Sequence, residues 1–193
     1  MNLSIEGIEK KLKQLEKDLL EARLLLDQTK ESMLKEGSFH VFSYFNYSLR
    51  LPKKTDDPTL YILGSFIIKN KGDRTLHRPY ICLKFNQNQD ISFSGKISQE
   101  DLVDPGFSPV PMQTWYYLDE ESQLLAHKEG EYWLEPIDVS ELPADRSLSF
   151  ANFMIRLERT KLDGPFKLEG ALFGDEIPEG LKALNKIQIN LAK

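Results

Sequence analysis

The spacing of apolar residues changes near Gly37, and this change constrains the fold more than any other feature of the chain. Before Gly37, apolar residues recur with a helical period, and residues 4–36 contain no proline. After it, apolar and polar residues alternate, which is typical of a β-strand with one buried face. We therefore expect two parts, a long amphipathic helix over residues 1–37 and a β-domain over residues 38–193.

The expected helix carries a heptad repeat of apolar residues when Ile5 is set at position a. Such a repeat, with charged residues around it, is typical of a coiled coil. The residues expected at the seam between helices are Ile5, Ile8, Leu12, Leu15, Leu19 and Leu26. The pattern thus predicts self-association through the helix, most simply as a dimer.

Two features of the helix leave its partner and its geometry open. Leu20, Leu24 and Leu25 lie outside the seam and widen the apolar stripe, as in a helix that docks on a globular surface. The stripe therefore also fits docking on the chain's own β-domain or on a partner protein. Parallel and antiparallel pairing both bring opposite charges together, so the sequence does not decide between them.

Beyond Gly37, short alternating runs are separated by turn-forming residues and predict a series of antiparallel strands. The expected strands cover residues 39–51, 60–69, 80–85, 91–97, 115–118, 124–128, 132–135, 148–158, 166–173 and 186–191. Glu129 and Gly130 are expected to form a tight hairpin, residues 98–111 a loop, and residues 178–184 a short helical turn. We expect a mainly β fold, in which the N-terminal α-helix is followed by an antiparallel immunoglobulin-like β-sandwich.

The alternation also predicts which side chains share a face of the sheet. In the first expected strand, every second residue from Phe45 to Leu51 is apolar. Because residues two apart point to the same face of a strand, that is, have the same parity, we expect Phe45, Tyr47, Leu49 and Leu51 on one buried face. In the strand over residues 148–158, Phe150 and Phe153 have opposite parity. We therefore expect these two rings on opposite faces.

The sequence contains no recognisable arrangement of catalytic or metal-binding residues. The three histidines lie in separate segments, and their spacing matches no metal-binding motif. Cys82, the only cysteine, alternates with Ile81 and Leu83 and is expected to be a small core side chain. The acidic run Asp119–Glu121 is expected in a solvated loop. We therefore expect no enzymatic activity, no cofactor and no metal ion.

Aromatic residues cluster in the region from Trp115 to Glu135. Both tryptophans of the chain, Trp115 and Trp133, lie there together with Tyr117. Exposed Trp and Tyr side chains are enriched in protein interfaces, and they also stack on sugar rings. Packing inside the core is the alternative role for such residues. We take Trp115, Tyr117 and Trp133 as the candidate recognition surface.

Net charge and hydropathy argue against several classes of partner. The chain has 193 residues, of which 25 are Lys or Arg and 30 are Asp or Glu, a formal net charge of −5. A protein that binds the phosphate backbone needs a basic surface, so we expect no nucleic-acid partner. No apolar run is long enough to span a membrane, and the first residues lack the pattern of a secretion signal. We therefore expect a cytoplasmic protein without a membrane span.

These patterns together predict a non-enzymatic interaction or adaptor module. Its helix is expected to bind a second copy or a partner protein, and its β-sandwich to present a recognition surface. One alternative is a structural or adhesive component of a larger assembly, such as a phage or spore particle. Another is a carbohydrate-binding or carbohydrate-active protein, because aromatic and acidic residues lie together between Trp115 and Glu135.

Overall fold

A computed structural model describes part of the N-terminal helix and most of the β-domain. The described residues are 11, 13–25, 38–51, 59–86, 91–98, 113–161 and 164–190. The chain divides into two units, Met1–Ser38 and Phe39–Lys193, which we treat separately.

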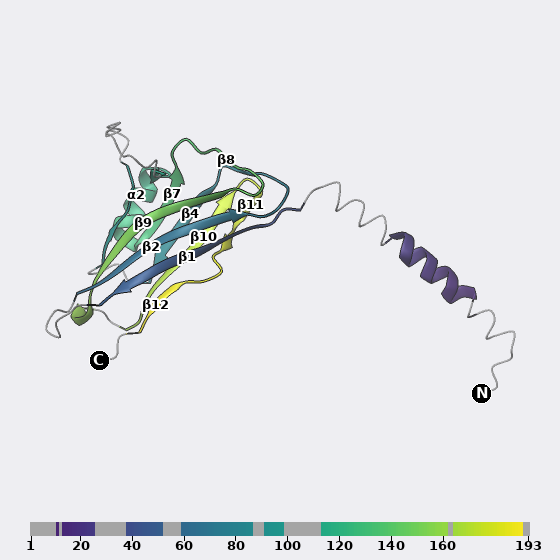
Figure 1. The fold of residues 1–193 in the computed structure, drawn as a ribbon, viewed down its shortest axis with the longest axis horizontal. Coiled ribbons are helices and arrows are strands. Elements are labelled where there is room, and N and C mark those ends of the chain that lie inside the picture. Colours follow the sequence, from purple (N-terminus) through teal and green to yellow (C-terminus); the bar gives the residue numbers. More distant parts are fainter. Residues whose placement is uncertain are drawn as a thin grey trace. The chain divides into compact units, whose positions relative to one another are not determined.

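In the first unit, residues 13–25 are helical (Figure 1), which confirms an N-terminal helix. Gln14 Nε2 donates a hydrogen bond to Asp18 Oδ1 at 2.8 Å, one turn further along the helix. Of the expected seam residues, Leu15 and Leu19 lie within this helix. The others, Ile5, Ile8, Leu12 and Leu26, lie outside the described residues.

The second unit is mainly β, as expected, and its named strands pair antiparallel. One sheet has the order β1 (Val41–Arg50), β2 (Thr59–Asn70), β9 (Ser147–Glu158) and β5 (Ile91–Ser94). The other has the order β11 (Ile177–Lys182), β10 (Phe166–Gly174), β4 (Tyr80–Phe85), β7 (Glu131–Pro136) and β6 (Trp115–Tyr117), with β12 (Ile187–Ile189) beside β10. A small third sheet pairs β3 (Leu76–His77) with β8 (Glu141–Leu142), and a 3₁₀ turn, Arg159–Lys161, follows β9.

The two larger sheets pack against each other and share one hydrophobic core. In Figure 1, β1, β2 and β9 lie in front of β4 and β10. Trp115 of β6 meets Phe150 of β9 edge to face, with ring centroids 5.7 Å apart. Gly170 of β10 lies so close to the other sheet that an added Cβ would be 2.5 Å from the ring of Phe66. Burying each large apolar side chain in this core contributes about 1.5–3 kcal/mol.

A bulge in β9 changes which side chains reach the core. Gly64 pairs with Phe153 and Phe66 pairs with Phe150, so Ser65 alone opposes two residues of β9. One of the two, Asn152, has a φ of 56°, in the left-handed region that asparagine tolerates better than most residues. Phe150 and Phe153 are consequently both fully buried, and their expected placement on opposite faces is wrong.

Residues 124–128 belong to α2 (Glu120–Glu129), so the strand predicted there is wrong. An apolar run this short does not distinguish a helix from a strand, and the residues around it decide. Asp119 caps the first turn by accepting a hydrogen bond from the backbone N–H of Ser122 at 2.7 Å. Gly130 ends the helix with a φ of 68°. The run Asp119–Glu121 therefore begins a helix rather than lying in a loop, and Gly130 joins a helix to β7 rather than closing a hairpin.

Residues 177–182 form strand β11 rather than the predicted helical turn. β11 lies at the edge of the six-stranded sheet, where Pro178 removes no hydrogen bond from a central ladder. Gly180 has a φ of 78°, and a Cβ added there would be 2.3 Å from the ring of Phe173. Antiparallel pairing with the preceding strand β10, in which Leu172 lies opposite Leu181, determines the structure of this segment.

The C-terminal half of β1 lies outside the core. Tyr47, Leu49 and Leu51 are 40%, 41% and 63% exposed, so the prediction of a continuous buried face is wrong beyond Phe45. Tyr47 and Leu49 point to the same side of the sheet as Phe45, which is buried, because all three have the same parity. The facing sheet therefore covers only the first half of this side of β1.

Candidate recognition surface

Trp115, the first predicted recognition residue, is fully buried between the sheets. Its indole Nε1 donates a hydrogen bond to the backbone oxygen of Ser149 at 3.3 Å, so the polar atom of the ring has a partner inside the core. This burial removes Trp115 from any exposed surface. It is a core residue that connects β6 to β9.

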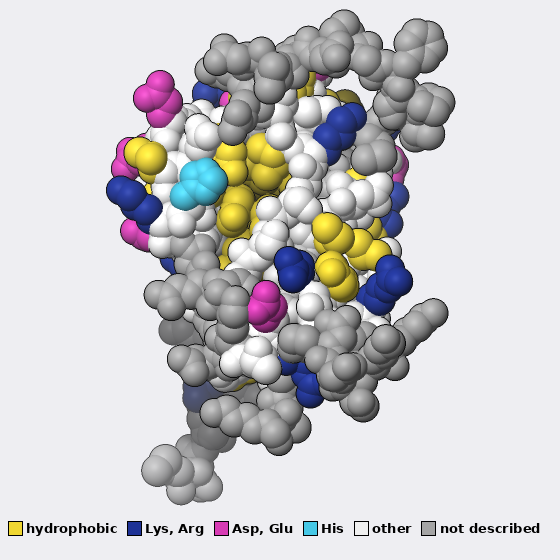
Figure 2. All heavy atoms as spheres, turned by 90° about the vertical axis from the view of Figure 1, so that its left-hand side faces the viewer, with side chains coloured by type: hydrophobic (Ala, Val, Ile, Leu, Met, Phe, Trp, Pro, Cys, Tyr) yellow, Lys and Arg dark blue, Asp and Glu magenta, His cyan; other side chains and the backbone are white. Residues whose placement is uncertain are grey.

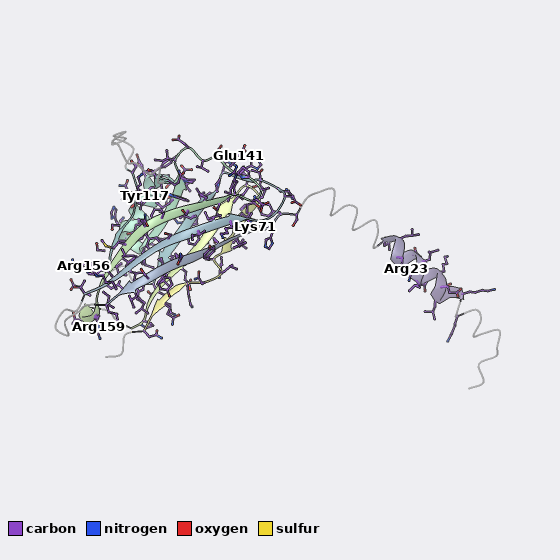
Figure 3. The ribbon with its side chains drawn as sticks, in the orientation of Figure 1. Arg23, Lys71, Tyr117, Glu141, Arg156 and Arg159 are labelled. Carbon is purple, nitrogen blue, oxygen red and sulfur yellow. The ribbon has the colours of Figure 1, made fainter. Side chains whose placement is uncertain are left out.

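Tyr117, the second predicted residue, lies partly exposed at the α2 end of the domain, away from Lys71 and Glu141 (Figure 3). Its ring stacks on Tyr132 with centroids 6.4 Å apart, and Tyr132 meets Phe93 at 4.7 Å. Burial raises the pKa of Tyr117 above its usual value and raises the pKa of Tyr132 to about 12. These rings close one end of the core, so Tyr117 faces away from Trp133.

Trp133, the third predicted residue, lies on the outer face of the six-stranded sheet with two rings that the sequence did not single out. Its ring centroid is 5.0 Å from that of Phe173 and 6.3 Å from that of Tyr80. Tyr80 and Phe173 are cross-strand partners and stack nearly parallel at 5.1 Å. We call Tyr80, Trp133 and Phe173 the outer aromatic row; all three side chains are partly exposed.

A charged pair borders the outer aromatic row. Glu131 accepts hydrogen bonds from the indole Nε1 of Trp133 at 2.9 Å and from Lys84 Nζ at 2.6 Å. The hydrogen bond from Lys84 lowers the pKa of Glu131, and the hydrogen bond to Glu131 raises the pKa of Lys84. Both groups are thus charged near neutral pH, and the hydrogen bond to Glu131 orients the indole of Trp133.

Cys82 lies in β4 between the outer aromatic row and the charged pair. It pairs across the strands with Trp133 on one side and Ala171 on the other. Burial raises the pKa of the Cys82 thiol to about 12. A thiol with so high a pKa is protonated at neutral pH and is a poor nucleophile. This position gives the thiol a packing role rather than a chemical one.

The helical unit presents several highly exposed apolar side chains. Five leucines of residues 13–25 are between 57% and 67% exposed: Leu15, Leu19, Leu20, Leu24 and Leu25. Leu15 and Leu19 lie one turn apart on one side of the helix, and Leu24 lies nearly opposite Leu15. Both described seam residues, Leu15 and Leu19, are thus exposed.

Hydrophobic side chains are also exposed in two groups at the end of the β-domain that faces the viewer in Figure 2. One group lies beside a histidine, and the other is bordered by Lys and Arg side chains. Separately, Leu63 and Met154 are exposed cross-strand partners on the outer face of the four-stranded sheet. Small groups of this kind are ordinary on protein surfaces.

Only Trp133 of the three predicted recognition residues lies in the outer aromatic row. Tyr80 and Phe173 are separated from it by many residues and carry no shared motif. Each lies next to a buried residue of its own strand, Tyr80 next to Ile81 and Phe173 next to Leu172, and therefore points to the opposite face of the sheet. The alternation of apolar residues in the sequence indicates this much. The pairing of β4 with both β7 and β10 then brings the three rings together, and no local signal predicts that pairing.

Among the described residues, no group of three or more His, Cys, Asp and Glu side chains is arranged to hold a metal ion. Within the same part of the chain, no helix has both the length and the apolar character needed to cross a membrane. Comparison with protein-family models finds no match, and comparison with curated proteins finds none of significant similarity.

Proposed function

We propose that this protein is a non-enzymatic interaction module that self-associates through its N-terminal helix and recognises another protein through its β-domain. The exposure of five leucines on residues 13–25 carries the proposal. A helix of this length is marginal by itself in water and gains most of its stability from packing of its apolar face. So much exposed apolar surface on one helix favours a partner that buries it.

The heptad spacing favours a second copy of the chain as that partner. Leu15 and Leu19 occupy consecutive d and a positions, and the stripe continues in the sequence at Leu12 and Leu26. A seam built this way is complementary to an identical seam, because each side chain inserts between side chains of the other helix. Binding to a different protein through the same leucines is the alternative.

Light scattering on the full chain with one substitution in the seam tests the proposal. Replacing Leu19 by Asp removes a buried leucine, which costs roughly 2–5 kcal/mol, and places an unpaired charge in an apolar seam. We expect Leu19→Asp to reduce the mass of the dimer to that of the 22.3 kDa monomer. The matched control is Leu24→Asp, which makes the same chemical change nearly opposite the seam and is expected to leave the dimer intact.

Two outcomes would count against helix-mediated dimerisation. A wild-type chain that is monomeric at high micromolar concentration contradicts self-association, and the leucines then serve another protein. Equal dissociation by Leu19→Asp and Leu24→Asp contradicts a two-stranded seam, because both sides of the helix would be buried. A mass far above that of a dimer instead supports the alternative of a structural component in a larger assembly.

The outer aromatic row supports the recognition part of the proposal. Tyr and Trp are enriched at protein interfaces, and the indole of Trp133 is already oriented by Glu131. We expect a Trp133→Ala bait to lose protein partners that wild type and a Leu63→Ala control bait both capture from the native host. The same three rings favour sugar stacking as a second candidate, and binding on a glycan array abolished by Trp133→Ala would support it instead.

We further propose that the β-domain is an immunoglobulin-like β-sandwich and that the protein acts in the cytoplasm. Two antiparallel sheets with one shared core support the sandwich. A single cysteine cannot form a disulfide within the chain, which is typical of proteins in reducing compartments and supports the location. The location is tested by fractionating host cells and measuring how much of the protein each fraction contains; we expect it in the cytoplasmic fraction.

A further inference from the structure

Strand β1 is an edge strand of the four-stranded sheet, and its free side has two parts with different surroundings. Its other side pairs with β2 along the whole length, from Val41 opposite Asn70 to Arg50 opposite Tyr61. The backbone groups on the free side are available for hydrogen bonds to anything that lies beside them.

The first part of this edge is occupied by the segment before β12. Asn185 accepts a hydrogen bond from the backbone N–H of Phe45 at 2.7 Å and donates one to its backbone oxygen at 2.9 Å. The backbone N–H of Leu184 donates to the oxygen of Ser43 at 2.8 Å. The backbone groups of Phe45 and the oxygen of Ser43 are therefore occupied, and these bonds show that odd-numbered residues of β1 direct their backbone groups outward.

Beyond Phe45 the outward backbone groups belong to Tyr47 and Leu49, followed by Leu51. In the described part of the chain, no hydrogen bond is made to these groups from outside the sheet. Their side chains are 40%, 41% and 63% exposed. The open edge thus combines unsatisfied backbone donors and acceptors with three exposed apolar side chains.

This edge lacks the features that usually prevent strand pairing. Proteins protect edge strands with proline, lysine, bulges or a covering segment. Residues 46–51 contain no proline, and Arg50 is their only charged residue. The parity of Arg50 differs from that of Leu49, so its side chain lies on the other face of the sheet.

We propose that the open edge, Tyr47–Leu51, pairs antiparallel with the same edge of a second copy of the chain, with Leu49 opposite Leu49. This contact goes beyond the helix seam of the proposed function and does not depend on it. Each outward residue would exchange both backbone hydrogen bonds with its opposite residue, as in any antiparallel ladder. The two four-stranded sheets would then form one continuous sheet across a twofold axis.

The residues of the edge select a second copy and one register. With Leu49 opposite Leu49, Tyr47 lies opposite Leu51 and Ser48 opposite Arg50, so apolar residues meet and like charges do not. A shift of the pairing in one direction places Arg50 opposite Arg50, which is unfavourable. A shift in the other direction requires the backbone groups of Phe45, which Asn185 already occupies. The open segment is therefore complementary to itself in one arrangement.

Disulfide cross-linking of the full chain tests the contact and its register. In a Cys82→Ala background, we expect Leu49→Cys to form a disulfide-linked dimer, since opposite residues of an antiparallel pair lie within reach of a disulfide. The matched control is Leu63→Cys, which is similarly exposed but lies on the outer face of β2. We expect Leu49→Cys to cross-link at least about tenfold faster than Leu63→Cys, because pairing raises the effective concentration of the two thiols.

A mixing experiment examines the register. Tyr47→Cys and Leu51→Cys chains are expected to cross-link to each other when mixed, and each only slowly to itself. Equal rates for Leu49→Cys and Leu63→Cys would mean random collision and would overturn the proposal. Rapid cross-linking of Tyr47→Cys to itself would overturn the antiparallel register. The absence of any cross-link would mean that an extended segment of another protein, or nothing, lies on this edge.

A further variant separates this contact from the helix seam. Adding Leu19→Asp to the Leu49→Cys chain removes helix pairing but leaves the open edge unchanged. Cross-linking that persists at higher protein concentration supports the edge contact even if the helix proposal fails. Adding Leu49→Pro to the Tyr47→Cys chain should abolish its cross-link to Leu51→Cys, because proline removes an outward N–H without breaking the β1–β2 ladder.

Discussion

At the scale of single residues, Cys82 combines a reactive functional group with a position that suppresses its reactivity. Its side chain is 8% exposed, and its neighbours across the strands are Trp133 and Ala171. Burial favours the neutral thiol over the thiolate, and the pKa rises to about 12 for that reason. The same packing that holds Trp133 on the outer face therefore keeps the thiol unreactive.

This placement predicts slow modification of Cys82 in the native protein. We expect a thiol reagent at neutral pH to label the folded chain slowly and the denatured chain fully, with labelling followed by mass spectrometry. The Trp133→Ala variant should be labelled faster, because it uncovers the sulfur without changing the backbone. Rapid labelling of the native wild type would contradict the burial of this side chain.

At the scale of elements, two charged contacts connect the end of β3 and the residue that follows it to the turn between β10 and β11. His77 Nδ1 lies 2.5 Å from Glu176 Oε1, and the backbone N–H of His77 donates to Glu176 Oε2 at 2.8 Å. Next to it, Arg78 Nε donates to both carboxylate oxygens of Asp175 at 2.8 and 3.0 Å. These contacts hold two loops together at one end of the six-stranded sheet.

The pair of His77 and Glu176 makes this connection sensitive to pH. The hydrogen bond to Glu176 raises the pKa of His77 above 6.5, because it favours the protonated ring. A raised pKa means that the charged pair contributes its full stability below pH 6.5 and loses it as the pH rises through the folded-state pKa. The two loops should therefore be less firmly connected under alkaline conditions than near pH 6.

An NMR titration of the His77 ring measures this effect. We expect the wild-type ring to titrate above 6.5 and the Glu176→Gln variant to titrate closer to 6.5. The variant should also lose the decrease in stability that we expect of the wild type as the pH rises above 6.5. A wild-type pKa at or below 6.5 would mean that the contact with Glu176 is not formed in solution.

At the scale of the whole molecule, the hydrophobic core is formed by the β-domain alone among the described residues. Its buried members extend from Val41 to Ile189 and come from both large sheets. Within the described helix, by contrast, every residue is exposed. The two units therefore differ in the source of their stability. The β-domain is stabilised by its internal packing, whereas the helix, under our proposal, is stabilised by pairing with the helix of a second chain.

This difference predicts that residues 38–193 fold without the helix. We expect the fragment Ser38–Lys193 to be soluble, to show a β-type circular dichroism spectrum and to melt cooperatively at a temperature close to that of the full chain. The same fragment should lose dimerisation through the helix. An insoluble or non-cooperative fragment, compared with a folded full chain, would show that the helix contributes to the core.

Local patterns in the sequence were sufficient for the class of fold and for most of its strands. The change of period at Gly37 separates the helical residues 13–25 from the first strand, because each period follows from backbone geometry alone. Strands β2, β4, β9 and β10 begin and end close to their predicted positions for the same reason. The prediction for residues 124–128 is wrong although a local signal existed, since Asp119 and Gly130 are ordinary helix caps.

Only the tertiary structure decided which apolar and aromatic side chains are buried. Trp115 and Trp133 lie in similar aromatic segments, yet one faces the opposite sheet and the other faces outward, because strand parity depends on pairing between distant segments. Likewise, Tyr47 and Leu49 have the same parity as the buried Phe45, but the facing sheet does not extend over them. Periodicity determines that a strand has two faces, whereas burial depends on what lies across from each face, and that is a property of the folded chain.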